Sequence, residues 1–440
     1  MDTRTNGKKL SRRQFLRASA TVLGAGVVSA CASTPTSAPA PKATGAPAAA
    51  PTAIPQARAQ KATVLMWTFP FTPDTSVYEP MQKAFTAANP NIDVQVQLEP
   101  WAGRENKMIA AVAAGNPPDA VYLNPDFYPK FVATETVIPL DKFMPAGFRD
   151  DFLPGALSAV SYNNQTYGLP ILTSAYTEMY NQELIEAAGV TDITTNWDTF
   201  KAAVRKVHNP AKEIWGAWFD LNRPSPVSTF VPFLRMAGGD QFTADGKDIA
   251  FDKPEGVEAL EYLTSFYKEG LVQKANATGG GLPFSSGKIG FFMQMETGSL
   301  VSVRTANPNM KLGIPPCLKH KEQSNFGTVG SFGVFKLSKN QEAAAKWLAF
   351  LTNPENSLTI LKASGFLSAR KSITPEKYAE GIVKDIAVQA PLMRSEPQHF
   401  YSREVMAAQQ PEFQAAYLGE QSAKDAITKS AAAARKILAG

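Results

Sequence analysis

The sequence predicts an α/β protein in which strands and helices alternate along the chain. Three segments show the pattern: a compact apolar run over residues 63–67, apolar residues at helical spacing over 77–88, and alternating apolar and polar residues over 92–98. Short apolar or alternating runs are typical of strands, and a period near 3.6 is typical of a helix. Strand, helix and strand in succession indicate a parallel pair joined by a crossover helix.

Capping residues mark the ends of the first elements. Ser76 and Glu79 have the spacing of a capping box at the start of the helix over 77–88. A second helix is expected over 103–114, with Gly115 placed as its C-cap. A third strand, buried by its composition, is expected over residues 120–123.

The same alternation continues to the end of the chain. Asn196 and Asp252 are predicted to be the N-caps of the two helices that follow them. The expected elements are strands over 177–180 and 289–293, and helices over 182–188, 197–207, 254–269, 341–351, 355–363 and 423–438.

The first thirty residues have the composition of an export signal. Ser11-Arg12-Arg13-Gln14-Phe15-Leu16-Arg17 precedes a short apolar run, and small residues precede Cys31. The Arg12–Arg13 pair resembles the twin-arginine signal, and the segment before Cys31 resembles a lipobox. The apolar run is shorter than the roughly 20 residues that span a bilayer. Residues 1–30 are therefore predicted to be a twin-arginine lipoprotein signal peptide, with lipid on Cys31; the alternative is an N-terminal anchor helix with an incidental cysteine.

The distribution of charge argues against nucleic-acid binding. The formal net charge is +5, but residues 1–30 hold six basic residues and one acidic residue, so the remainder is formally neutral. Residues 31–60 consist mostly of Ala, Pro, Thr and Ser, which cannot form a packed core. We interpret this segment as a tether that holds the folded part at the outer face of a membrane.

The sequence gives no sign of a metal, a cofactor or a disulfide. If Cys31 carries lipid, Cys317 has no partner and is expected to be a small buried hydrophobe. The three histidines, His208, His320 and His399, are far apart in the sequence and lack neighbouring ligands.

Several segments after the tether resemble extracellular solute-binding proteins of ABC importers, and in particular the sugar-binding group of the maltose-binding proteins. The most specific is Ala113-Ala114-Gly115-Asn116-Pro117-Pro118-Asp119. The others are residues 61–101, 180–184, 197–200, 284–290, 333–340 and 365–370. Their order and spacing extend the resemblance over nearly all of the chain after residue 60.

The resemblance implies a two-lobed fold of the periplasmic-binding-protein type II, each lobe a sheet flanked by helices, with a hinge that closes around a ligand. It places residues 61–171 and 311–353 in the N-terminal lobe, and 172–310 and 354–440 in the C-terminal lobe. It implies a monomer that captures a sugar or oligosaccharide, delivers it to a membrane permease and performs no covalent chemistry.

In open α/β sheets the ligand lies beyond the carboxyl ends of strands, so residues at those positions are the site candidates. Aromatic rings suit the apolar faces of sugars, and carboxylate, amide and guanidinium groups suit their hydroxyls. The candidates are Trp67, Phe69, Trp101, Asn124, Asp126, Trp218, Asp220, Arg223, Glu296 and Phe332.

Alternatives stay open for several of these residues. Trp67 and Trp218 also fit lobe cores, Asp126 fits a helix N-cap, and Glu296 fits a solvated loop. Sugar-binding relatives often carry a tryptophan where this chain has Leu300, which leaves room for another solute.

Three other functions are weighed against sugar capture. The first is the same role for a polyamine, a peptide or a metal chelate. The second is a secreted glycan-processing enzyme, which needs two paired carboxylates. The third is a structural or sensory lipoprotein.

Overall fold

The computed structural model describes residues 61–70, 74–101, 103–193, 196–219 and 228–440. Arg12, Arg13 and Cys31 of the predicted signal, and the site candidates Asp220 and Arg223, lie outside these ranges. Within the described ranges, every helix is too short or too polar to cross a membrane.

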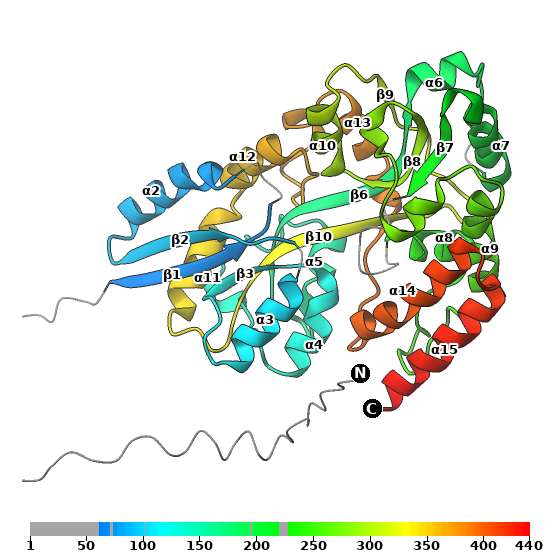
Figure 1. Cartoon of the computed structure of the whole chain (residues 1–440). Helices are drawn as coiled ribbons and strands as arrows, with labels where there is room; N and C mark the ends of the chain where they lie inside the picture. Colours follow the sequence, from blue (N-terminus) through cyan, green and yellow to red (C-terminus); the bar gives the residue numbers. More distant parts are fainter. Residues whose placement is uncertain (1–60, 71–73, 102, 194–195, 220–227) are drawn as a thin grey trace, which may run out of the picture. The chain divides into compact units, whose positions relative to one another are not determined.

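A single mixed sheet connects the two lobes (Figure 1). Its strands follow the order β2-β1-β3-β10-β6-β8-β7. β1 pairs in parallel with β2 and β3, β7 pairs in parallel with β8, and the long strands β10 and β6 pair antiparallel with each other. The bounds are β1 Ala62–Thr68, β2 Ile92–Leu98, β3 Ala120–Leu123, β6 Leu169–Asn181, β7 Trp215–Phe219, β8 Ile289–Glu296 and β10 Asn325–Val334.

Shorter strands extend this sheet and form a small hairpin. β9, Leu312–Gly313, pairs with β6, and β11, Met393–Arg394, pairs with β10. β4, Ser161–Tyr162, and β5, Gln165–Thr166, pair with each other.

Helices cover both faces of the sheet (Figure 1). Their bounds are α2 Glu79–Ala88, α3 Arg104–Ala113, α4 Tyr128–Ala133, α5 Pro154–Ser158, α6 Gln182–Ala187, α7 Trp197–Val207, α8 Val231–Met236, α9 Pro254–Lys268, α10 Ser299–Ala306, α11 Gln341–Leu351, α12 Pro354–Ser364, α13 Ile382–Val388, α14 Ser402–Leu418 and α15 Ala423–Ala439.

Each lobe has a core on both sides of its part of the sheet. Around β1, β2 and β3, α2, α11 and α12 pack on one face and α3 and α4 on the other, although the predicted boundary at residue 354 assigns α12 to the C-terminal lobe. In the C-terminal lobe, α7, α9, α14 and α15 share one core, while α10 and α13 share another. Ile360 and Leu361 of α12 pack with Val64 and Trp347 of the N-terminal lobe. The exact lobe boundaries stay a prediction.

Two predicted caps are wrong. α2 begins at Glu79 without a side-chain cap, because Ser76 lies in a separate 3-10 turn where its N–H donates to Asp74. Asp252 does not cap α9, since its carboxylate accepts a hydrogen bond of 2.7 Å from Arg435. The Asn196 cap of α7 is confirmed by a 2.9 Å bond from the N–H of Thr199.

The sequence patterns missed two long elements. α14 contains Pro411 in its interior, which ordinarily argues against a helix. β10 contains three glycines, which are weak strand formers. Gly330 and its neighbours are nevertheless buried in the sheet, so tertiary pairing outweighs local propensity there.

Candidate functional site

The crossing strands β6 and β10 present one face toward the carboxyl end of β3. Ser174 and Tyr176 lie directly opposite Thr328 and Phe326, and residues opposite each other in an antiparallel pair share a face. Asn124, the residue after β3, donates a hydrogen bond of 3.0 Å from Nδ2 to Thr328 Oγ1. This shared face is therefore on the side predicted for a ligand, and we call it the front face.

A cluster of aromatic residues and one arginine lies where the N-terminal lobe borders the front face. The rings of Phe69 and Trp101 stack with their centroids 4.8 Å apart, and Tyr122 meets Phe69 edge-on at 6.0 Å. The Arg104 guanidinium lies 4.7 Å from the Trp101 ring centroid and donates a bond of 2.7 Å to Asn124 Oδ1. Trp101 keeps 42% of its surface exposed, so part of this platform is free.

Asp126 meets an arginine from the C-terminal lobe. Arg403, in the first turn of α14, donates through Nη1 to Asp126 Oδ2 and through Nε to Glu105 Oε2 at 2.7 Å. Asp126 is 8% exposed, and its Oδ1 has no hydrogen-bond partner. The residue lies in the 3-10 turn Pro125–Phe127 and makes no side-chain cap, so the N-cap alternative is not realised.

Glu296 ends β8 beside the same face. It lies opposite Tyr176 in the register of β6 and β8. Burial raises the pKa of Tyr122 well above its ordinary value; Arg104 opposes this shift, while Glu296 and Glu396 add to it. Glu296 is therefore within electrostatic reach of the Tyr122 hydroxyl.

Three other candidates lie in packed regions. Trp67 is 9% exposed and packs with Met108 and Phe127 under α3. Trp218 packs edge-on against Phe292 at 4.7 Å in the C-terminal lobe. Phe332 is fully buried against Tyr122. Trp67 therefore agrees with the core alternative that the sequence left open, whereas Trp218 is only partly buried.

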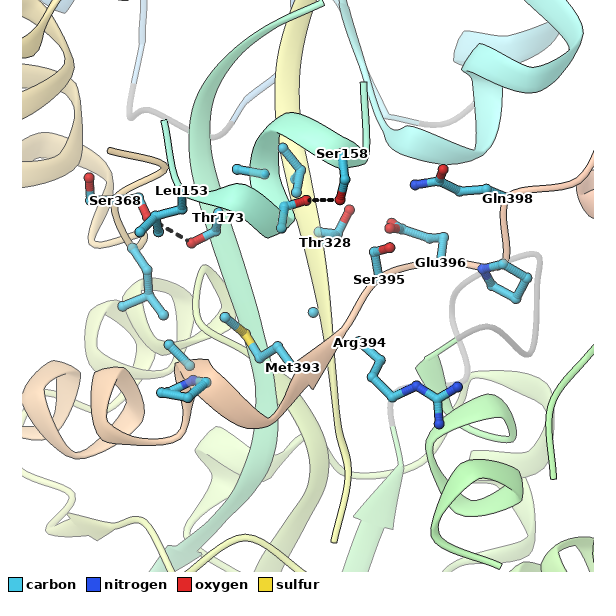
Figure 2. A pocket seen from close by; sticks show the side chains of 18 of the residues that line it. Leu153, Ser158, Thr173, Thr328, Ser368, Met393, Arg394, Ser395, Glu396 and Gln398 are labelled. Carbon is cyan, nitrogen blue, oxygen red and sulfur yellow. Dashed lines mark hydrogen bonds between the residues drawn. The ribbon is translucent and has the colours of Figure 1, made fainter. Parts of the chain in front are cut away.

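A cavity of about 990 Å³ lies on the opposite face of the crossing strands. Thr173 and Val329 line it; they pair in register and alternate with the front-face residues Ser174 and Thr328. Figure 2 shows Ser158 on one side of the cavity and Met393 on the other. Thr328 borders both spaces. The candidate residues converge on the front face, so we place the site there.

Sequence reasoning missed five residues of the front face: Arg104, Tyr122, Ser174, Thr328 and Arg403. Arg104 was within reach, because it follows the chosen Trp101 by one helical turn. Ser174 and Thr328 lie in the middle of strands, where a rule about strand ends does not look. Arg403 required knowledge of α14, which the sequence patterns missed.

The described part of the chain contains no cluster of three or more His, Cys, Asp or Glu side chains suited to a metal. Cys317 is 3% exposed, and burial raises the pKa of its thiol to about 12, so it is a poor nucleophile at neutral pH. The front face instead offers stacking surfaces and hydrogen-bonding groups, which suit reversible binding of a polar solute.

Two lobes on one sheet, with polar and aromatic residues gathered where they meet, define a hinged binding protein. A family model described as bacterial extracellular solute-binding protein matches residues 81–390, and this chain belongs to that family. It is a binding protein that acts outside the cytoplasm, and not an enzyme.

Named relatives and solved structures agree with this family. A putative binding protein of Brucella abortus is 27% identical over 68% of this chain and 74% of its own length. The maltotriose-binding protein of Pyrococcus abyssi is 22% identical over 68% of this chain and 65% of its own.

The fold is shared with solved binding proteins. The substrate-binding protein Lmo0181 of Listeria monocytogenes, in complex with cycloalternan, has a TM-score of 0.76 at 21% identity and covers 86% of this chain and 100% of its own. Maltose-bound MalE3 of T. maritima has a TM-score of 0.74 at 22% identity, with the same coverage of both chains.

Proposed function

We propose that this chain captures a sugar or oligosaccharide between its two lobes and delivers it to the permease of an ABC transporter. One observation carries the proposal: the half-exposed Trp101, stacked on Phe69, stands on the same face as the buried carboxylate of Asp126. Proteins named for maltotriose, arabinooligosaccharide and galactooligosaccharide binding are among its relatives, which supports a carbohydrate ligand.

The chemistry of the front face fits a neutral polyol. A sugar's C–H face gains dispersion and hydrophobic energy on an aromatic ring, and its hydroxyls need buried partners. Asp126 Oδ1 and Ser174 Oγ are buried acceptors without a partner. A hydroxyl that donates to either oxygen would remove the cost of leaving it unsatisfied.

We propose that Phe69, Trp101, Asn124, Asp126 and Glu296 face the solute. Trp67, Trp218 and Phe332 then support the site from the packed regions behind it. We also propose, from the sequence alone, that Asp220 and Arg223 contact the solute.

Leu300 determines whether the C-terminal lobe provides an aromatic stacking surface for the sugar at this position. It is 3% exposed and packs in the core beside Phe292. The position that holds a tryptophan in many sugar-binding relatives is therefore occupied by a core residue, and the stacking surface proposed here comes from Trp101 in the N-terminal lobe.

We further propose that the chain is a monomer held by lipid on Cys31 at the outer face of a membrane, after export directed by Arg12 and Arg13. Labelled fatty acid incorporated in cells should be lost in Cys31→Ser and kept in Cys317→Ser. Label retained in Cys31→Ser would contradict the anchor without affecting the solute.

Thermal unfolding against a panel of sugars, polyamines and dipeptides tests the solute. A ligand that binds only the folded chain adds about 2.7 kcal/mol at a hundredfold excess over Kd. A shift of the melting temperature with one class of oligosaccharide is the expected result. A shift only with a polyamine or peptide would retain the importer role and replace the sugar.

A further inference from the structure

We infer that Arg403 is a positioning residue that joins the two lobes in the closed protein and orients Asp126 for the solute. The inference rests on the proposed function for the second of these roles. The first role, the joining of the lobes, stands on the contacts alone.

Arg403 and its partners belong to different lobes. α14 packs through Val405 and Phe413 in the core it shares with α9 and α15. Glu105 lies in α3, and Asp126 lies just after β3, in the N-terminal lobe. The Arg403 guanidinium reaches both carboxylates and lies 4.2 Å from the Phe127 ring centroid.

The chemistry of the pair is suited to orienting a carboxylate. The planar guanidinium offers donors in a fixed fork, and here one branch goes to Asp126 Oδ2 and the other to Glu105. Because Oδ2 is occupied, Oδ1 is left as the acceptor, and it is buried without a partner. A lysine at this position could supply charge, but not the same fork.

Neighbouring contacts join the same two surfaces. Lys130 of α4 forms an ion pair with Glu404, the residue after Arg403. The Tyr162 hydroxyl donates to Gln398 Oε1 at 3.2 Å, just before α14. Gln398, Arg403 and Glu404 therefore form a strip of the C-terminal lobe whose side chains bond residues of the N-terminal lobe.

Separation of the lobes would break this strip. Asp126 would then lose the arginine that fixes its carboxylate. Closure of the lobes therefore also orients Asp126 Oδ1 as an acceptor for the solute. The ion pairs also favour the closed state by themselves, and salt weakens interactions between partly exposed charges. Some closure before solute binding, decreasing with ionic strength, follows from this arrangement.

The first test measures maltotriose affinity by calorimetry with the full chain. Arg403→Gln should raise Kd at least about tenfold, because the buried Asp126 loses its partner. Arg403→Lys should recover only part of the loss. The matched control is Arg435→Gln, whose guanidinium bonds two carboxylates, Asp248 and Asp252, within the C-terminal lobe. Its Kd should stay within about twofold of the original chain. Equal affinity of Arg403→Gln and the original chain would overturn the orienting role of Arg403.

The second test needs no solute. Two fluorophores, one on each lobe, report the distance between the lobes in the ligand-free full chain. The original chain should open as sodium chloride is raised, while Arg403→Gln should be open at every concentration and Arg435→Gln should follow the original chain. Distances that are identical in Arg403→Gln and the original chain would overturn the joining role. If maltotriose and every other sugar fail to bind, the proposed function fails, and this second test still decides the role of Arg403 in closure.

Discussion

Gln294 of β8 donates a hydrogen bond of 2.7 Å from Nε2 to Oε1 of Glu178 in β6, and both side chains are 1% exposed. The pairing of β6 and β8 is irregular between Thr177 and Met179, and Gln294 has a positive φ of 51°. Burial raises the pKa of the Glu178 carboxyl to about 7, which exceeds the opposing effect of the Gln294 bond. The C-terminal lobe thus holds a carboxylic acid in its core.

The buried Glu178 carboxyl should make the stability of the fold depend on pH. Its ordinary pKa is 4.5 and its folded pKa is about 7, so between these values the folded chain binds the proton more tightly than the unfolded chain. The free energy of unfolding should therefore fall as the pH rises from about 5 to 8. Glu178→Gln should flatten this part of the profile in urea unfolding, whereas Glu186→Gln on the exposed side of α6 should not. An unchanged profile in Glu178→Gln would exclude Glu178 as the cause.

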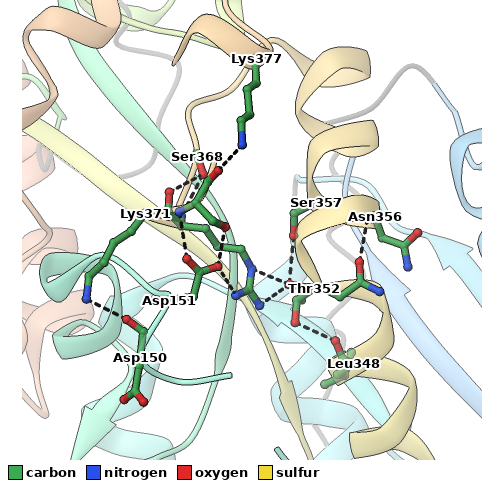
Figure 3. A network of polar contacts seen from close by, with 12 residues as sticks. Asp150, Asp151, Leu348, Thr352, Asn356, Ser357, Ser368, Lys371 and Lys377 are labelled. Carbon is green, nitrogen blue, oxygen red and sulfur yellow. Dashed lines mark hydrogen bonds and ion pairs between the residues drawn. The ribbon is translucent and has the colours of Figure 1, made fainter. Parts of the chain in front are cut away.

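Replacement of Arg370 is expected to cause a large loss of stability. Its Nε donates to the Thr352 carbonyl at 2.8 Å and its Nη1 to Asp151 Oδ2 at 2.9 Å. Figure 3 shows Asp151 and Thr352 in this network of polar contacts. The guanidinium also lies 4.4 and 4.2 Å from the ring centroids of Phe148 and Phe152. Arg370→Met should lower the free energy of unfolding by about 3–5 kcal/mol, because it leaves buried acceptors unpaired.

Chemical denaturation measures this change. The matched control is Lys371→Met at the next position, where an exposed ammonium bonds the carbonyl of Asp150. Its effect should stay below about 1 kcal/mol. Equal losses in the two variants would show that the buried network adds nothing beyond a surface contact.

A side chain at position 330 is expected to clash with Tyr122 on the front face. A Cβ at this position would lie 2.1 Å from the Tyr122 hydroxyl, so Gly330→Ala must displace the ring. We expect a loss of about 1–3 kcal/mol in thermal or urea unfolding. Gly155→Ala in α5 is the control, since its Cβ meets nothing within 4 Å and alanine favours helix. A Gly330→Ala chain as stable as Gly155→Ala would contradict the close packing of Tyr122.

Replacement of Trp101 is expected to weaken binding of the sugar without destabilising the fold. Because the side chain is 42% exposed, Trp101→Ala removes little of the core, but it removes the platform proposed for a sugar ring. Kd for a bound oligosaccharide should rise about tenfold. Leu337→Ala, at a position 51% exposed beyond β10, should leave Kd unchanged. Unaltered affinity in Trp101→Ala would remove this residue from the site.

The sequence predicted elements whose signals are local. β1, β2 and α3 lie within a residue or two of their expected bounds, because each carries its own periodicity. Asn196 was found as a cap because the interaction spans three residues. α14 could not be found in this way, since Pro411 argues against a helix and burial against α9 and α15 outweighs that signal.

The site was predicted less completely than the fold. The rule about strand ends selected Phe69, Trp101 and Asn124, which the structure brings together, and Asp126, which Arg403 holds. The same rule selected Trp67, which points into a core, because a pattern of strand ends does not say which face a side chain takes. Arg403 follows Asp126 by 277 positions, and that distance is closed only by tertiary folding.

Calorimetric titration tests most directly whether the front face binds a sugar. The full chain and its Trp101→Ala and Asp126→Asn variants are titrated with the oligosaccharide class that raises the melting temperature most. We expect saturable binding of one oligosaccharide per chain, weakened in both variants. Binding of a polyamine or a dipeptide with no response to any sugar, or sugar binding that neither variant weakens, would contradict it.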